Sequence, residues 1–368
     1  MPQQTSFYLA MTAGVAAAGV GAVLLAVPAR STPAQTCDAP PATDADAAAC
    51  ELAAKLERLY LDRETGARYA AALRDSVAAG RYASLSAEQA AAAITRDLQA
   101  VSPDGHLRVF PAGGPRPGAK GPPQGAEAPA LEQAGWIAPG IAYLRMTMFP
   151  HDPAVTQAAA RFMAEHATAR ALIFDLRTHR GGGVEQMDVI LPWLFAEPTR
   201  LVTMETTLAA ERELGSPVEG LASMRKLDDP AMVRREHWVT PNAESSLRGA
   251  QVYLLVGPRT ASAAEHFAWA MKTTRRATLV GEPTAGANHF GGEIALAGGL
   301  AAFLPVGRTF DPVTGQDWEG TGVLPDLAVA KEVALERVLV ELGLSAAQAR
   351  ALSQSHRPTL PMDRRPRG

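Results

Sequence analysis

One stretch, residues 252–271, constrains the fold more than any other part of the chain. It begins with five apolar, partly β-branched residues (Val252–Val256), is broken by a glycine and a proline, and resumes with apolar residues at helical spacing. The pattern predicts a strand, a tight loop and a helix. Ser262 stands where the helix is expected to begin, and free backbone N–H groups and the helix dipole favour an anion there, including the oxyanion of an acyl transfer. Because Ser262 and Glu265 also have the spacing of a capping box, a purely structural role for the serine stays open on this stretch alone.

Strands alternate with helices elsewhere in the chain, which predicts an α/β core with parallel pairing. Residues 140–146, 171–176 and 278–280 are the expected strands, and residues 153–167 are an expected helix. The strand at 171–176 is followed by a glycine-rich turn, Arg177–Gly183, and then by an apolar helix. Such a turn leaves backbone N–H groups free to face an anion. It lacks the spacings of a phosphate-binding P-loop and of a dinucleotide fold, so no nucleotide cofactor is expected.

Length and composition narrow the classes of partner. With 368 residues the chain exceeds the usual size of one domain, so a main domain and a smaller part are expected. Hydrophobic residues make up 47% of the chain and charged residues 20%, and the formal net charge is −3. This balance argues against wholesale disorder and against a nucleic-acid partner, so polypeptides or small molecules are the expected ligands. No metal site or other cofactor is predicted, and the sequence does not fix the oligomeric state.

The first 34 residues are expected to be a signal peptide or a membrane anchor. Phe7–Val27 is an uncharged run long enough to cross a bilayer, but no Lys or Arg precedes Arg30, unlike in an ordinary secretory signal. Export with cleavage, to the periplasm or out of the cell, is the preferred interpretation, and membrane association through this segment is the alternative. Cys37 and Cys50 follow. In an oxidising compartment they would close a small loop, and two unpaired thiols are the other interpretation.

The rest of the chain divides by periodicity and composition. Residues 44–105 have the pattern of three helices and are expected to form an N-terminal helical subdomain. Residues 106–135 hold a short strand, with His106 at its beginning, and a Pro- and Gly-rich linker. The core is expected to span residues 136–345, and residues 346–368 are expected to be a disordered tail. A lone histidine beside a turn is ordinarily a surface residue.

Four motifs, taken in order, resemble those of the tail-specific (carboxy-terminal processing) serine peptidase superfamily. They are Phe174-Asp175-Leu176-Arg177 with its trailing glycines, Thr260-Ala261-Ser262-Ala263-Ala264-Glu265, Gly281-Glu282-Pro283-Thr284-Ala285-Gly286 and Gly322-Val323-Leu324-Pro325-Asp326. The helical part and Asp104-Gly105-His106 resemble the branch typified by interphotoreceptor retinoid-binding protein and the tricorn core. The match runs from about Asp46 to Leu342. It implies a crotonase-like (ClpP/crotonase) α/β core with an N-terminal three-helix subdomain, and it implies that Ser262 is the nucleophile.

Two catalytic arrangements occur among such relatives, and the residues present favour one of them. A Ser-Lys dyad has its lysine in the loop after the next strand, where this chain has Ala285–Asn288 and no lysine. Lys272 is the nearest lysine, and it lies about 15 Å further along the serine's own helix. The tricorn-like arrangement uses a histidine of the Asp-x-His segment and a glutamate shortly before the last motif, and His106 and Glu319 stand in those places. In such a triad the histidine takes the serine proton and the glutamate orients the imidazole.

We expect the oxyanion hole to be formed by backbone N–H groups that lie near the serine in the folded chain. The N–H of Ala263 and that of Gly181 or Gly182 are the candidates. The superfamily usually has asparagine where this chain has His179, which leaves the shape of the hole open.

Two other histidines are rivals for the role of the base. His266 follows Ser262 by one helical turn, and His289 is a weaker rival. His106 is preferred because neighbours on a helix project side by side and seldom point a ring nitrogen at the serine oxygen.

The expected function is that of a serine-type endopeptidase acting on polypeptides through an acyl-enzyme. The alternative is a non-catalytic carrier of retinoids or fatty acids, because retinoid-binding relatives keep the fold and fold does not decide function. The serine, histidine and glutamate all occur in the expected order, which favours hydrolysis. Phe110–Ile137 leaves too few residues for a PDZ domain in its usual place, so the peptide specificity is not predicted.

Overall fold

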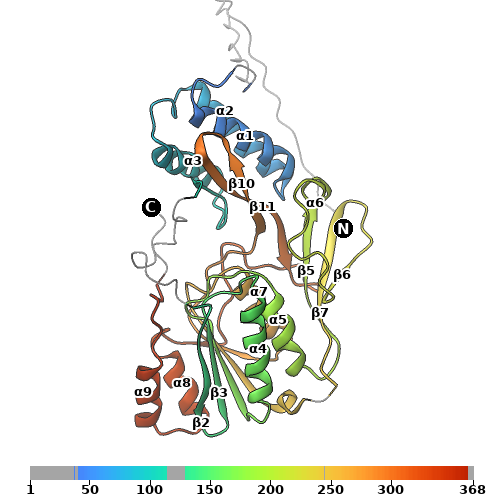
Figure 1. Ribbon diagram of the computed structural model, residues 1–368, viewed down its shortest axis with the longest axis vertical. Helices are drawn as coiled ribbons and strands as arrows, with labels where there is room; N and C mark the ends of the chain where they lie inside the picture. Colours follow the sequence, from blue (N-terminus) through green and yellow to red (C-terminus); the bar gives the residue numbers. More distant parts are fainter. Residues whose placement is uncertain (1–36, 38–39, 114–128, 244, 364–368) are drawn as a thin grey trace, which may run out of the picture. The chain divides into compact units, whose positions relative to one another are not determined.

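The computed structural model describes residues 37, 40–113, 129–243 and 245–363 (Figure 1). Over these residues the chain has a mixed α/β fold with two six-stranded sheets. The expected signal or anchor at residues 1–34 and most of the Pro- and Gly-rich linker lie outside the described residues. Among the helices of the described part, none is long and apolar enough to cross a membrane.

The first sheet is mainly parallel, as the alternation of strands and helices predicts. Its strands are β2 (Leu131–Ala138), β3 (Ile141–Met146), β4 (Ala171–Asp175), β8 (Gln251–Val256), β9 (Thr278–Gly281) and β12 (Leu327–Ala328). The order is β12-β9-β8-β4-β3-β2, and every neighbouring pair is parallel except β2 with β3. The edge strand β2 begins before residue 136, where the core was expected to start, because it is mostly half-exposed and its apolar residues do not alternate regularly with polar ones.

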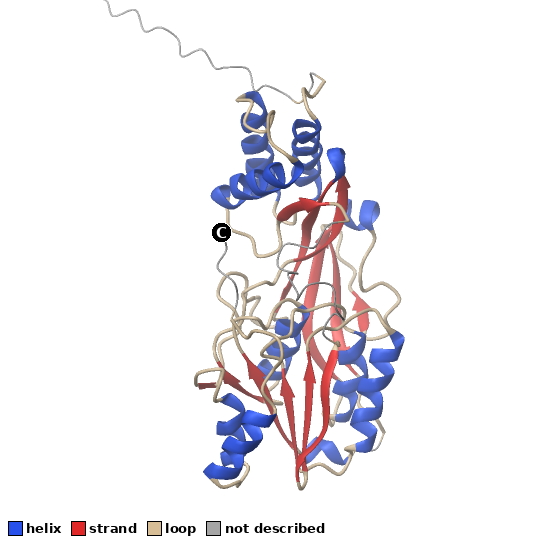
Figure 2. Ribbon diagram, turned by 60° about the vertical axis from the view of Figure 1, so that its left-hand side comes forward, coloured by secondary structure: helices blue, strands red, loops and turns tan. Residues whose placement is uncertain are grey.

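Both faces of this sheet are covered by helices. These are α4 (Pro153–Glu165), α5 (Glu185–Ile190), α7 (Ala263–Thr273), α8 (Ala334–Glu341) and α9 (Ala346–Ser355). On β4, Leu172 and Phe174 belong to the apolar core shared with α4, α5 and α7, whereas Ala171 and Ile173 belong to the core shared with α8 and α9. Figures 1 and 2 show helices on opposite sides of these strands. The alternation explains why the sequence of β4 is continuously apolar from Ala171 to Phe174.

The second sheet is antiparallel. Its strands are β1 (Arg108–Pro111), β5 (Thr199–Thr207), β6 (Met224–Lys226), β7 (Met232–Val239), β10 (Phe290–Leu296) and β11 (Leu300–Phe310). The order is β1-β11-β5-β7-β6, and β10 also pairs with β11. Short helical segments complete the described chain, namely α6 (Leu208–Leu214), η1 (Leu191–Trp193), η2 (Ser246–Gly249) and η3 (Ala297–Gly299).

Three helices precede the first strand and pack on the second sheet. They are α1 (Asp44–Leu59), α2 (Arg63–Ala78) and α3 (Ala87–Val101), and each begins at a residue whose side-chain oxygen accepts a backbone N–H. Leu52 of α1, Tyr69 of α2 and Ile94 of α3 share an apolar cluster with residues of β10 and β11. The turn that follows α3 therefore lies between the helices and the second sheet, and this turn carries His106.

Helix α9 corrects the prediction of a disordered tail that begins at residue 346. Ser345 and Gln348 form a capping box at its start, and Ala349 and Leu352 pack in the core shared with α8. The sequence of α9 is rich in alanine and has few large apolar residues, so its helical period is weak. The prediction is wrong for residues 346–355.

Cys37 and Cys50 form a disulfide that ties the segment before α1 to that helix. Of the two interpretations that the sequence left open, the structure has the paired one.

We expect both cysteines to be oxidised in protein taken from its native host, because a persistent disulfide requires an oxidising compartment. Alkylation without reductant, followed by mass spectrometry, should find no free thiol at either position. The pair is separated by 13 residues, and Cys50→Ser should lower the free energy of unfolding by up to about 3 kcal/mol, the entropy of a loop of that size. Free thiols in the native protein would contradict both the pair and an exported location.

Candidate active site

Ser262 occupies the turn between β8 and α7 in a backbone conformation that few residues other than glycine adopt. Its φ is 55° and its ψ is −123°. Sharp strand-to-helix turns of this kind expose the nucleophilic serine of α/β-hydrolases, and such strained backbone is typical of functional sites. Gly181 lies directly against it, since a β-carbon on this glycine would be 2.7 Å from the Ser262 Cβ. The site therefore needs a residue without a side chain opposite the serine.

Glu265 fixes the backbone of Ser262 from the first turn of α7. One carboxylate oxygen of this buried residue accepts the N–H of Ser262 at 2.9 Å and that of Ala287 at 2.9 Å. The other accepts the hydroxyl of Thr284 at 2.6 Å and the N–H of Gly286 at 2.7 Å. Burial raises the pKa of Glu265 to about 7, and the four hydrogen bonds oppose that rise. Glu265, which the sequence suggested as part of a capping box, thus also clamps the loop after β9.

The glycine-rich turn starts from a buried network of charges at the end of β4. Asp175 accepts hydrogen bonds from Tyr143 at 2.6 Å, from Arg145 at 3.1 Å and from Arg177 at 2.6 Å. Burial alone would raise the pKa of Asp175, but the two guanidinium groups hold it well below its usual range. Arg177 also donates to the carbonyl of Lys331 at 2.7 Å. The beginning of the turn is therefore anchored on both sides.

Two of the three N–H groups predicted for the oxyanion hole remain available for it. The N–H of Gly181 donates to Nδ1 of His179 at 3.1 Å. Within the described residues, no hydrogen bond from the N–H of Gly182 or of Ala263 is found. A β-carbon on Gly181 would lie 3.2 Å from the Ala263 nitrogen, so the glycine turn and the start of α7 face each other. Gly182 has to be glycine because a β-carbon there would lie 1.9 Å from the carbonyl oxygen of Phe149.

His179 shapes this turn as a neutral side chain. It is completely buried against Phe149, with ring centroids 4.1 Å apart. Burial, with a smaller contribution from the charge of Arg180, lowers the pKa of His179 to about 3. Because its Nδ1 accepts the Gly181 N–H, its proton is on Nε2. Because His179 accepts the N–H of Gly181, that N–H is not free to bind an oxyanion.

Asp104 organises the turn that carries His106. Its Oδ1 accepts the N–H of His106 at 2.8 Å and that of Leu107 at 3.1 Å, and its Oδ2 accepts the hydroxyl of Tyr60 at 2.8 Å. The side chain of Gln99 bonds the N–H and the carbonyl of Asp104 at 3.1 Å and 2.9 Å. Since Tyr60 follows α1 and Gln99 lies on α3, the helical part of the chain sets the position of this turn.

Glu319 reaches the same turn from the other side. One of its oxygens accepts the N–H of Gly105, the residue before His106, at 3.3 Å. The other accepts the N–H groups of Asn288 at 2.7 Å and His289 at 3.1 Å. The ring of His106 stacks on Phe303 of β11 with centroids 5.3 Å apart. The segments that carry His106 and Glu319 are therefore in contact, although they are more than 200 residues apart in sequence.

His289 forms an ion pair with Asp104 beside Glu319. Its Nδ1 lies 2.8 Å from Asp104 Oδ2 and 3.9 Å from Glu319 Oε2. Ligand atoms of these three residues lie within 4.8 Å of one another, as at a metal site. Backbone N–H groups already occupy both oxygens of Glu319 and one of Asp104, so the cluster has the character of a hydrogen-bonded assembly rather than of a cation cage.

Sequence reasoning missed this cluster. In the sequence, Asp104 stands out only as part of the motif Asp104-Gly105-His106. No periodicity could join Asp104 to His289, which lies 185 residues later.

The hydrogen bonds of His266 argue against its acting as the base. Its Nε2 is hydrogen-bonded to Nδ1 of His237 at 2.9 Å, and Nε2 of His237 bonds Asp188 at 3.0 Å. Burial lowers the pKa of His266 well below its usual value. The Nε2 atom of His266 is therefore already hydrogen-bonded to a residue of strand β7, which carries His237.

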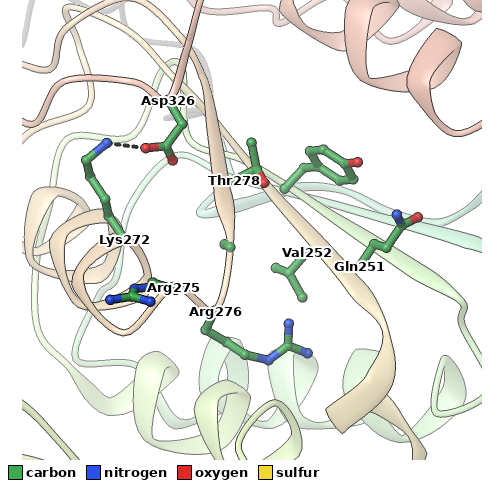
Figure 3. A pocket seen from close by; sticks show the side chains of 9 residues that line it. Gln251, Val252, Lys272, Arg275, Arg276, Thr278 and Asp326 are labelled. Carbon is green, nitrogen blue, oxygen red and sulfur yellow. Dashed lines mark hydrogen bonds and ion pairs between the residues drawn. The ribbon is translucent and has the colours of Figure 1, made fainter.

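One pocket of the described part lies away from Ser262. A cavity of about 400 Å³ is lined by residues at the start of β8 and the end of α7 (Figure 3). Lys272 in its wall pairs with Asp326, and Arg276 donates to three backbone carbonyls. Because α7 begins beside Ser262, Lys272 is about 15 Å from the serine along the helix axis. This pocket does not belong to the candidate active site.

Comparison with known proteins finds one family model and several solved structures of similar fold. The model of peptidase family S41 matches residues 140–329. The photosystem II D1 C-terminal processing protease is similar at 18% identity and a TM-score of 0.52, over 83% of this chain and 99% of that one. A lipoprotein from Streptococcus agalactiae is similar at 13% identity and a TM-score of 0.52, over 81% of this chain and 96% of that one. At such identities the two structures are evidence of a shared fold.

We expect Glu265→Gln to destabilise the protein at pH 8, where the carboxylate is ionised. An amide nitrogen in place of one oxygen would face two donors and leave them unpaired, at about 1–3 kcal/mol for each. Urea denaturation followed by tryptophan fluorescence measures the loss. As a matched control, Glu341→Gln removes a surface ion pair with Arg337 on α8 and should change the free energy of unfolding by less than about 0.5 kcal/mol. Equal midpoints for the two variants would refute the clamp.

Proposed function

Because the chain belongs to peptidase family S41, as its match over residues 140–329 shows, we propose that this serine peptidase cleaves polypeptides as an endopeptidase through a Ser262–His106–Glu319 triad. The observation that carries the proposal is the tight turn at Ser262, with φ of 55°, set against the bare backbone of Gly181. A serine that served only as a helix cap would need neither the strained backbone nor a glycine opposite it.

The proposed reaction follows the general course of acyl transfer. His106 takes the proton of the Ser262 hydroxyl as its oxygen attacks the peptide carbonyl carbon, and it then gives that proton to the leaving amine. The N–H groups of Ala263 and of Gly182, the glycine whose N–H is not bonded to His179, stabilise the negative oxygen of the tetrahedral intermediate. Water, activated in turn by His106, hydrolyses the acyl-enzyme.

Glu319 supports His106 in this proposal. Its carboxylate holds the N–H of Gly105, next to the histidine, and its negative charge favours the imidazolium that forms during the reaction. The loop from Gly286 to His289 connects the two halves of the site, since its N–H groups bond Glu265 behind the serine and Glu319 behind the histidine.

The proposal has a structural and a cellular part. Residues 136–345 would form a crotonase-like core, which the parallel strands β4, β8 and β9 with helices on both faces support. Helices α1–α3 would form an N-terminal subdomain that supplies the base. The Cys37–Cys50 disulfide supports an exported protein, and the thiol measurement described above tests this part.

We expect Ser262→Ala to abolish covalent labelling by a serine-directed fluorophosphonate and to leave the fold intact, since only a hydroxyl is removed. Gel fluorescence measures labelling, and circular dichroism measures folding. Ser355→Ala, an exposed serine at the end of α9, is the control and should be labelled like the parent. Equal labelling of Ser262→Ala and the parent would refute the nucleophile. A parent that is never labelled but copurifies with a retinoid or a fatty acid would favour a carrier instead.

We expect His106→Ala to lower the hydrolysis of labelled casein by on the order of 10⁴-fold or more, because the serine loses its base. Glu319→Gln should give a large but smaller loss. The kcat/KM of the parent should rise with pH through the range in which histidine loses its proton, because the base has to be neutral.

His266→Ala and His179→Ala serve as comparison variants and should cost much less activity than His106→Ala. If His266→Ala or His289→Ala removes activity as completely as Ser262→Ala while His106→Ala does not, the base has been misassigned.

A further inference from the structure

We propose that His289 is a positioning residue of this site, a cation that joins Asp104 to Glu319 and thereby holds the turn of His106 against the loop that Glu265 joins to Ser262. The inference rests on the proposed triad and adds a residue that acts through it.

The geometry of His289 ties together three separate segments. Its side chain bonds Asp104 at 2.8 Å, in the turn after α3, and its own N–H bonds Glu319 at 3.1 Å, before the last sequence motif. It ends the loop in which the N–H groups of Gly286 and Ala287 bond Glu265. A displacement of His289 would therefore move the histidine side of the site relative to the serine side.

Charge balance requires a cation at this place. The side chains of Asp104 and Glu319 are 1% and 18% exposed, and no lysine or arginine is paired with either in the described part of the chain. Two carboxylates so close together in a poorly hydrated site repel each other. His289, with a side chain 15% exposed, lies between them and is the group that compensates their charge.

The ionisation of the pair is consistent with this role. Burial by itself would raise the pKa of Asp104, but His289 and the surrounding donors lower it to about 2. Burial by itself would lower the pKa of His289, but Asp104, Glu319 and Asp317 raise it above its usual value. Tyr60 also faces the pair, and burial raises its pKa far above the physiological range, so its hydroxyl stays neutral. With its Nδ1 proton held by Asp104 and its ring charged, His289 is a poor acceptor for the serine proton.

This arrangement predicts a second limb in the pH profile. A histidine whose pKa is raised in the folded protein keeps its ion pair at low pH and loses it as the pH rises through the raised value. The base, in contrast, has to be neutral and fails at low pH. The activity should therefore be bell-shaped, with the alkaline limb set by His289.

The experiment measures the second-order rate constant of fluorophosphonate labelling from pH 5 to 10 for the full-length protein and its variants. His289→Gln keeps a hydrogen-bonding side chain but carries no charge. Its rate constant at pH 7 should fall by on the order of 10²-fold, the effect of a small misplacement of reacting groups, and the alkaline limb should disappear. His166→Gln, at the end of α4, where the ring contacts Trp136 and Phe162, is the matched control and should keep both the rate and the limb.

Asp104→Asn provides an independent variant that nearly preserves shape. It should lower the pKa of His289 and so move the alkaline limb to lower pH, which a purely structural defect would not do. Thermal unfolding shows whether each variant is folded, and if His289→Gln is not, the shift in Asp104→Asn decides alone.

The outcomes separate this inference from the proposed function. No labelling of the parent would refute the triad itself. A labelled parent whose profile is unchanged in Asp104→Asn, or in a folded His289→Gln, would overturn the role of His289. Loss in His289→Gln as complete as in Ser262→Ala, with disappearance of the acid limb instead, would make His289 the base and would also overturn the inference.

Discussion

The structure of the site depends on one buried carboxylate. Glu265 accepts hydrogen bonds from four donors in three places in the chain, namely the N–H of Ser262, the hydroxyl of Thr284 and the N–H groups of Gly286 and Ala287. Each of these donors would otherwise be buried and unpaired, so the loop after β9 has no equally favourable alternative position. The unusual φ of Ser262 is stable because this clamp and the packing of Gly181 determine it together.

The helical part of the chain is needed for the same site. The family match at residues 140–329 contains Ser262 and Glu319 but neither Asp104 nor His106. These two residues follow α3, and their turn is held by Tyr60 and Gln99 from the helices. The proposed base thus depends on the packing of α1–α3 on the second sheet. An α/β core without these helices would keep the proposed nucleophile and the proposed oxyanion hole but would lack the residue that we propose accepts the serine proton.

Sequence patterns predicted those elements whose formation depends on residues close together in the chain. The strand, loop and helix around Ser262 were evident because apolar spacing changes from continuous to helical at a glycine and a proline, and the parallel sheet followed from the alternation of strands and helices. Helix α9 was missed because its alanines give a weak period. The pairing of Asp104 with His289 could not be predicted, since side-chain contacts across 185 residues leave no spacing in the sequence. The position of His179 was noted, but its capture of the Gly181 N–H needed coordinates.

The distribution of charge in the site matches the needs of acyl transfer. The reaction develops negative charge on the substrate oxygen and positive charge on the imidazole, so donors are needed at one end and carboxylates at the other. At the serine end Gly181 faces Ser262 and the backbone nitrogen of Ala263 at the start of α7, beside a histidine that stays neutral. At the histidine end Asp104 and Glu319 provide two carboxylates, and in our proposal a protonated His289 compensates one of them. One net negative charge then remains next to His106. That is enough to favour the imidazolium, whereas two uncompensated charges would bind its proton so tightly that its return to the leaving amine would be slowed.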